Sequence, residues 1–180
     1  YKADRVSFDK DPKTFIANFA AGSGALQLNR PQTTLEIYQH LDPTSFKFNK
    51  PLELWWLGNY AMAYMQLGQY DKALEVIRNV SPKVNRLYYL RAQLYVLKKE
   101  TDSLNLLIQE MENNRASENE ILGRIHKIAY DFGAKGDTAN QLKWGKRMLS
   151  RINNRPESMP LPLERLGLAY FITEDYENML

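Results

Sequence analysis

One short block of residues recurs along the chain, and this repetition limits what the chain can fold into. The clearest copy runs from Tyr64 through Gly68 and Tyr70 to Ala73 and Leu74. Copies before and after it share its pattern, and their spacing is irregular. The residue at the position of Gly68 is in turn Asn29, Gly68, Lys99, Gly136 and Glu174. Such a chain is expected to build repeated units that each contact their neighbours, instead of folding around one central core.

Each copy has the apolar spacing of two helices separated by a tight turn. In the second copy, apolar residues three or four positions apart form one stripe before Gly68 and a second stripe after it. The first stripe contains Leu54, Leu57, Tyr60, Ala61, Tyr64 and Leu67, and the second contains Ala73, Leu74, Ile77 and Val80. Pro43 and Pro82 end the second helices of their copies, because proline cannot continue the hydrogen-bond ladder. Strand patterns are nearly absent, so the sequence predicts an all-α fold.

The block Tyr64-x-x-x-Gly68-x-Tyr70-x-x-Ala73, with Ala61 three residues before Tyr64, resembles the tetratricopeptide repeat (TPR). The fifth copy, with Gly167, Tyr170 and Tyr176, shares part of the pattern. Small residues recur where the two helices of a pair would cross, at Ala61, Ala92, Ala129 and Gly167. The resemblance implies an α-α superhelix, a right-handed α-solenoid, of about five TPR-like helix pairs. We expect an N-terminal extension at 1–13 and a repeat domain at 14–180. The expected repeats are 14–43, 52–82, 84–112, 120–152 and an incomplete 160–180.

Two related kinds of helical array were also considered. The irregular repeats, most of them longer than the common TPR unit, are similar to those of divergent arrays attached to bacterial signalling and regulatory proteins. Pentatricopeptide RNA-binding proteins use similar helix pairs, but their repeats are more uniform and lack the Gly-x-Tyr-x-x-Ala turn. The resemblance to the tetratricopeptide repeat therefore covers the chain best, from about Thr14 onward.

No arrangement of residues typical of an enzyme is present. The chain has no cysteine, which excludes disulfides, thiolate metal sites and a cysteine nucleophile. The glycines at 22 and 24 lack the third glycine and the preceding strand of a dinucleotide loop. The two histidines, His40 and His126, are far apart in sequence and have no zinc-ligand spacing. We found neither a phosphate-binding Gly-Lys-Ser/Thr loop nor a nucleophile elbow. We therefore expect no catalytic residues, no metal and no cofactor.

Binding to another protein is the better prediction. In a solenoid of helix pairs, the first helices line the concave face. The repeat register then selects the side chains that would face a partner, and they include Trp, Tyr, Arg and Met, which are enriched in interface hot spots. These candidates are Trp55, Asn59, Met62, Gln66, Arg86, Tyr89, Gln93, His126, Lys127, Tyr130 and Arg165. The alternative is that Trp55 or Tyr89 packs against a neighbouring repeat.

Some members of the family hold a peptide C-terminal carboxylate with Lys and Asn residues of successive first helices. Here Asn59 matches the Asn, and Arg86 could replace one Lys. Phe19 and Ser23 stand where a Lys and an Asn are expected, and Leu90 stands where a basic residue is expected. This departure from the pattern argues against a clamp for the tail of a chaperone.

A basic stripe is the one strong charge feature. Basic residues recur four positions apart, and no acidic residue occurs between Asp137 and Glu157. The stripe consists of Lys143, Lys146, Arg147, Arg151 and Arg155. On an outer helix it could meet phosphates or an acidic partner, whereas the simpler interpretation is a solvated face near a helix C-terminus. The net charge of +3 is too small to predict nucleic-acid binding by itself.

The sequence thus predicts a non-enzymatic protein-protein interaction module, a scaffold or adaptor that binds a peptide or protein surface in its groove. Because the chain starts at Tyr1 and ends inside a predicted helix, we expect it to be part of a larger, bacterial protein. The alternative is the sensor or regulatory arm of a bacterial signalling protein or transcriptional regulator. No apolar run approaches membrane-spanning length, so a soluble module is expected. The sequence does not decide the partner, the oligomeric state, or between a cytoplasmic and a periplasmic location.

Overall fold

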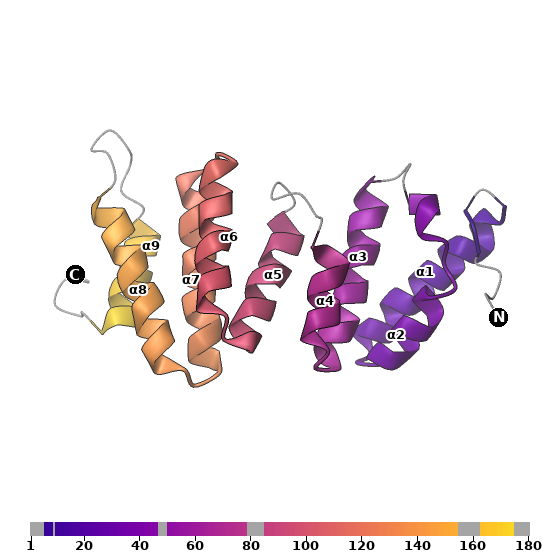
Figure 1. Ribbon diagram of the computed structural model, residues 1–180, viewed down its shortest axis with the longest axis horizontal. Coiled ribbons are helices and arrows are strands. Elements are labelled where there is room, and N and C mark those ends of the chain that lie inside the picture. The colour runs from indigo at the N-terminus through magenta and orange to yellow at the C-terminus, as the bar shows by residue number, and fades with distance from the viewer. Residues whose placement is uncertain (1–5, 9, 47–49, 79–84, 155–162, 175–180) are drawn as a thin grey trace. The chain divides into compact units, whose positions relative to one another are not determined.

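The computed structural model describes residues 6–8, 10–46, 50–78, 85–154 and 163–174 (Figure 1). Its helices form two compact units, Tyr1–Leu94 and Tyr95–Leu180, with the boundary inside α5. Among the described residues, the only β-structure is a single isolated bridge between Val6 and Leu41. The predicted all-α fold is confirmed.

Most of the helices are joined in antiparallel pairs by short turns (Figure 1). Within the described residues, three such pairs lie inside single units, and their two helices contact each other: the pairs that end before residue 39, before residue 78 and before residue 154. The first unit contains α1 (Pro12–Gln27), α2 (Pro31–Tyr38), the short 3-10 helix η1 (Pro43–Phe46), α3 (Lys50–Gln66) and α4 (Tyr70–Ile77). Helix α5 (Asn85–Lys98) spans the boundary. The second unit continues with α6 (Thr101–Asn113), α7 (Glu118–Ala134), α8 (Thr138–Asn153) and α9 (Leu163–Thr173).

The turn inside each pair has the same backbone conformation. The φ angle is positive at every turn position that the sequence repeat selects: 55° at Asn29, 71° at Gly68, 57° at Lys99, 73° at Gly136 and 58° at Glu174. In four of these turns the next residue donates its N–H to the carbonyl five residues back, as in Gln69 to Tyr64 at 2.9 Å and Asp137 to Phe132 at 3.0 Å. This bond closes the first helix in the left-handed cap that favours glycine. The structure therefore confirms the register of the repeat.

A small residue lets the two helices of a pair come close together. In the first pair, a Cβ atom on Gly22 of α1 would lie 2.2 Å from the ring of Tyr38 on α2, so only glycine fits. Ala61 and Ala129, at the same position of later repeats, are fully buried. Between successive pairs of the second unit, Gly145 of α8 gives similar room to Ile172 of α9, whose Cγ2 would lie 2.4 Å from an added Cβ.

The core of the first repeat extends into the segment before the second repeat. Phe46 of η1 is fully buried and stacks on Trp56 of α3, with ring centroids 4.9 Å apart. These two residues form one buried cluster with Phe15, Phe19, Tyr38 and Leu41. Phe46 lies between the expected repeats 14–43 and 52–82, in neither of them. The structure shows that part of this segment is core.

Residues of the predicted N-terminal extension also pack on the first repeat. The N–H of Val6 donates to the carbonyl of His40 at 2.8 Å, and the N–H of Asp42 donates to the carbonyl of Val6 at 3.0 Å. The N–H of Phe8 donates to Oγ of Ser45 at 2.9 Å. Residues 6–8 therefore cover the end of the first helix pair.

Within the described part of the chain, three helices have N-caps that the local sequence supplies. Asp11 accepts from the N–H of Thr14, and Asp137 accepts from the N–H of Asn140, both at 3.1 Å. Ser117 and Glu120 form a reciprocal capping box at the start of α7. The hydrogen bonds with Thr14, Asn140 and Ser117 hold the pKa values of Asp11, Asp137 and Glu120 below their ordinary values.

The turn geometry predicts opposite effects of alanine at two glycines that both have open space around them. Gly136→Ala should destabilise the protein by about 1 kcal/mol, because φ is 73° there and a Cβ is strained in the left-handed region. Gly24→Ala, inside α1, should stabilise it by about 0.5–1 kcal/mol, because alanine favours the helix. Urea denaturation followed by circular dichroism measures both changes. Equal effects of the two substitutions would contradict the role assigned to the turn.

Candidate functional site

The first helices of neighbouring repeats lie against each other within each unit. Helix α1 contacts α3, and α7 contacts α9. The side chains that the sequence selected for a partner come from these first helices and from α5. Some of these side chains are exposed and others are packed between helices. Those of Arg86 and Arg165 lie outside the described residues.

Trp55 is exposed, as the groove prediction requires. Its side chain is 49% exposed on α3, and its ring meets the ring of Phe19 on α1 edge-on, with centroids 6.3 Å apart. Ile16 lies one helical turn before Phe19 and is 43% exposed. We call Trp55, the buried Phe19 against it and the exposed Ile16 one helical turn away on α1 the Trp55 surface. It joins two successive repeats.

Ile16 was missed by the sequence reasoning, although the repeat register could have found it. Ile16 precedes the turn residue Asn29 by the same interval that separates Trp55 from the turn residue Gly68. Ile16 and Trp55 thus occupy the same repeat position. The signal was hidden because the first copy carries an isoleucine where the second carries a tryptophan.

Asn59 is placed differently from the prediction, in the buried interface between the first two repeats. Its exposed fraction is 4%, and its Nδ2 donates to Oγ of Ser23 at 2.9 Å and to the hydroxyl of Tyr38 at 3.2 Å. Burial raises the pKa of Tyr38, while its bonds with Ser23 and Asn59 oppose that rise. The amide of Asn59 is therefore used inside the protein and does not face a partner.

Most of the remaining candidates of the second and third repeats are half-buried, and two of them are hydrogen-bonded to each other. Met62 is half-buried against the cluster of the second repeat, whereas Gln66 is exposed. On α5, Nε2 of Gln93 donates to the hydroxyl of Tyr89 at 2.9 Å, and both side chains are half-buried. The side chain of Arg86 lies outside the described residues.

In the second unit, the candidates on α7 form a charged and aromatic group. The ammonium of Lys127 pairs with Asp131 at 2.5 Å and lies 4.6 Å from the ring centroid of Tyr130. Tyr130 is 59% exposed, and His126 is half-buried. The neighbouring helix α9 carries Phe171, which is 60% exposed. The side chain of Arg165 lies outside the described residues.

The basic stripe on α8 is not a uniform solvated face. Arg151 binds both carboxylate oxygens of Glu118 on α7 and also contacts Glu112 on α6. The hydrogen bond with Glu118 is the main reason that the pKa of Arg151 is raised. The guanidinium of Arg147 donates to Oδ1 of Asn105 at 2.6 Å and lies over the ring of Trp144. Two of the expected phosphate-binding residues are therefore already engaged within the unit.

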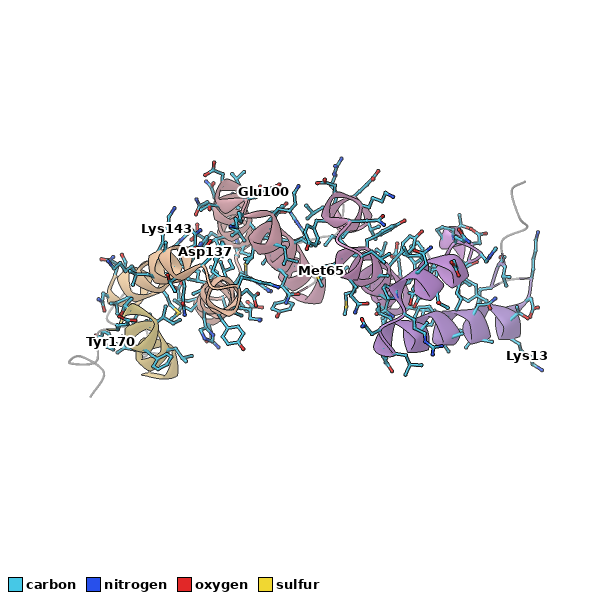
Figure 2. All side chains as sticks on the ribbon, turned by 90° about the horizontal axis from the view of Figure 1, so that it is seen from below. Lys13, Met65, Glu100, Asp137, Lys143 and Tyr170 are labelled. Carbon is cyan, nitrogen blue, oxygen red and sulfur yellow. The ribbon has the colours of Figure 1, made fainter. Side chains whose placement is uncertain are left out.

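The lysines of the stripe remain exposed. Lys143 and Lys146 are exposed, and Figure 2 shows Lys143 extending away from α8. Arg155 falls outside the described residues. An exposed pair of lysines is a weaker site for nucleic acid than the five-residue stripe that the sequence suggested.

The described residues offer no group of three His, Asp or Glu side chains that could hold a metal ion. Within the same part of the chain, no helix has both the length and the apolar character that a membrane crossing requires.

Comparison with known proteins identifies the fold. No family model matches the sequence, and no curated protein matches it. The chain is similar to a kinesin light chain protein of Podosopora anserina with nearly identical TPR-like repeats, at 14% identity and a TM-score of 0.52. A single-substitution variant of that protein matches at 15% identity, with the same TM-score. Both matches cover 92% of this chain and 89% of the other. The fold is that of TPR-like repeats. At these identities the similarity shows the fold alone.

Within the TPR-like repeats, the contrast between Asn59 and Trp55 can be tested by stability. Asn59→Ala should lower the free energy of unfolding by about 1–2 kcal/mol, because it removes a buried donor from Ser23 and Tyr38. Trp55→Tyr should lower it by less than about 1 kcal/mol, because half of the side chain is already in solvent and tyrosine keeps an aromatic ring against Phe19. Urea denaturation of both variants measures the difference. A larger loss for Trp55→Tyr than for Asn59→Ala would place Trp55 in the core.

The ion pairs of Arg151 give a second stability test. Arg151→Gln should cost about 1 kcal/mol, because it breaks the contacts with Glu112 and Glu118. Lys143→Gln, on the same helix and with the same charge change, should cost less than about 0.5 kcal/mol. The difference should shrink in 1 M NaCl if it is mainly electrostatic. Equal costs at low salt would show that the ion pairs contribute nothing to stability.

Proposed function

We propose that this protein is a non-enzymatic interaction module that binds a peptide or protein surface through the first helices of its TPR-like repeats. The observation that carries the proposal is the exposure of Trp55 on α3, where its ring lies against Phe19 of α1 and Ile16 is exposed one helical turn from Phe19. The second unit supports it with exposed aromatic side chains on α7 and α9, Tyr130 and Phe171.

The physical argument rests on the cost of exposing these side chains. A half-exposed tryptophan keeps apolar area in water that could be buried, at about 25 cal/mol per Å². Tryptophan and tyrosine are also the residues that most often dominate binding energy at interfaces. Trp55 is supported by Phe19 beneath it, so it would lose little conformational entropy when a partner covers it. The surface is therefore suited to an apolar or aromatic side chain of the partner.

The ion pair beside Tyr130 adds a polar edge to the corresponding face of the second unit. Lys127 is held by Asp131 and lies over the ring of Tyr130, which fixes the direction of both side chains. We expect a partner segment there to combine an apolar side chain with a hydrogen-bonding group. Together, the two faces favour a protein ligand over a small molecule.

Partner capture with paired variants tests the proposal. Trp55→Ser and Tyr130→Ser should each weaken binding of the captured partner about tenfold or more, which is typical of an interface hot spot. Leu106→Ser is the matched control, since Leu106 is 64% exposed but lies on the second helix α6. Binding is measured by calorimetry on the purified pair, with circular dichroism to confirm folding.

If the two first-helix variants bind as the wild type does, while Leu106→Ser loses binding, the partner would lie on the second helices and the proposal would be wrong. Loss of binding in all three variants would also contradict the proposal, because binding would then not distinguish the first helices from the second helix α6. Only a loss confined to Trp55→Ser, Tyr130→Ser or both supports the first-helix faces.

A further inference from the structure

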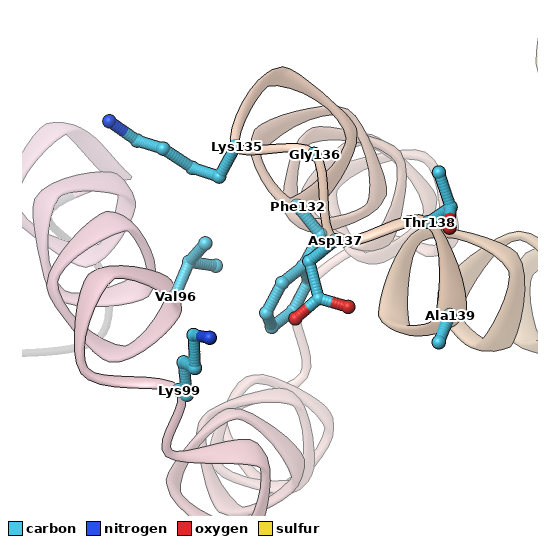
Figure 3. A pocket seen from close by; sticks show the side chains of 8 residues that line it. All are labelled: Val96, Lys99, Phe132, Lys135, Gly136, Asp137, Thr138 and Ala139. Atoms are coloured by element: carbon cyan, nitrogen blue, oxygen red, sulfur yellow. The ribbon is translucent and has the colours of Figure 1, made fainter.

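A pocket lies within the second unit, at the end where the turns inside the helix pairs are found (Figure 3). Its volume is about 420 Å³. One side is formed by the end of α5 and the turn at Lys99, and the other by the turn between α7 and α8. None of the candidate residues discussed above lines it. It is therefore separate from the faces assigned to the partner in the proposed function.

The pocket combines an apolar floor with two cations. Val96 and Phe132 line it and are 4% and 1% exposed. Lys99 and Lys135 also line it, and both side chains are exposed. Figure 3 shows the ammonium of Lys99 on the side facing Asp137, and Lys135 extending from the rim. Among the described residues, neither ammonium is within ion-pair distance of a carboxylate, unlike those of Lys98 and Lys127.

The backbone fixes where these lysines are. Lys99 occupies the left-handed position of its turn, with φ at 57°, and Lys135 is the C-cap of α7. Both lysines therefore follow the last turn of a helix, where the partial negative charge of the carbonyl ends favours a cation. The turn of the third repeat and the turn of the fourth thus each bring one lysine to the same pocket.

Asp137 also lines the pocket, but its carboxylate already serves α8. Oδ1 accepts from the N–H of Asn140 at 3.1 Å, and Oδ2 accepts from Nδ2 of Asn140 at 2.9 Å. These two bonds are the main reason that the pKa of Asp137 is lowered, and Lys99 adds a smaller effect. Asp137 therefore stays ionised at neutral pH. With two lysines and one aspartate, the pocket has an excess of one positive charge.

We infer that this pocket binds a single side-chain carboxylate, Asp or Glu, of an acidic peptide segment. The ammonium groups of Lys99 and Lys135 would pair with the carboxylate, and the floor of Val96 and Phe132 would receive an adjacent apolar side chain. A phosphate dianion fits less well, because the negative charge of Asp137 faces the same space and repels a double charge more strongly. The inference does not depend on the first-helix faces.

Nuclear magnetic resonance of the ¹⁵N-labelled chain provides the test, with two blocked tripeptides as probes. Acetyl-Leu-Glu-Leu-amide carries one carboxylate, and acetyl-Leu-Gln-Leu-amide is its neutral match. We expect the charged tripeptide to cause saturable shifts at the backbone amides of Lys99, Gly136 and Asp137, and the neutral one to cause none. Absence of saturable shifts with the charged tripeptide, or equal shifts with both, overturns the inference.

Variants of Lys99 separate binding from stability. Lys99→Gln should weaken binding of the charged tripeptide about fivefold, as expected for a partly exposed ion pair. Lys143→Gln, with the same charge change on α8, should weaken it less than about twofold. Lys99→Gly should lose binding equally, and yet be at least as stable as the wild type, because glycine relieves the positive φ. Equal binding by Lys99→Gln and Lys143→Gln overturns the inference.

The substitution Asp137→Asn should strengthen binding of the charged tripeptide, whereas the lysine variants weaken it. Asparagine caps a helix as well as aspartate does, so α8 should remain intact. Removing the charge should tighten binding of the charged tripeptide about threefold and allow inorganic phosphate to compete. Asp71→Asn, an exposed position at the start of α4, is the matched control and should leave binding unchanged. If inorganic phosphate binds the wild type more tightly than the tripeptide does, the pocket is a phosphate site and the inference is wrong.

Discussion

The close contact between the two helices of each pair is the constraint on which the rest of the structure depends. A tight turn holds the axes of the two helices close together. The residues at the point where the helices cross must therefore be small. Gly22 against Tyr38 shows how narrow this range is, because even a methyl group on α1 would overlap the ring. The left-handed residue of the turn then reverses the chain without a longer loop. Once these two conditions are met, each pair offers an apolar edge that only another pair can cover.

Polar side chains connect neighbouring helices beyond this apolar contact. In the first unit, Asn59 of the second repeat reaches Ser23 and Tyr38 of the first. In the second unit, Arg151 joins α8 to Glu118 of α7 and Glu112 of α6. Polar groups that bond inside the protein specify one register between repeats, because a shifted register would leave them buried without partners. The same residues are for that reason not available to a ligand.

The two proposed binding sites follow from different parts of the repeat. The Trp55 surface lies along the first helices of the first two repeats, which leave Ile16 and Trp55 in solvent at the same repeat position. The pocket of Lys99 and Lys135 lies at the turns, where helix ends favour cations and small side chains leave space. The Trp55 surface would contribute buried apolar area to binding, and the pocket of Lys99 and Lys135 would select for a negative charge. A solenoid can carry both because its helix faces and its turns vary independently in sequence.

The sequence by itself determined the helical fold, the repeat register and the position of every turn inside the described pairs. These features are local: they depend on apolar spacing and on which residue follows the first helix, as at Gly68 and Gly136. Trp55, which the sequence selected for the groove, is half exposed and also packs against Phe19 of the neighbouring repeat. Only the tertiary structure decided that Asn59 and Arg151 face other helices, that Phe46 is core, and that Lys99 and Lys135 share a pocket. Their roles depend on which side chain of another helix or turn lies opposite, and residue spacing within one helix does not contain that information.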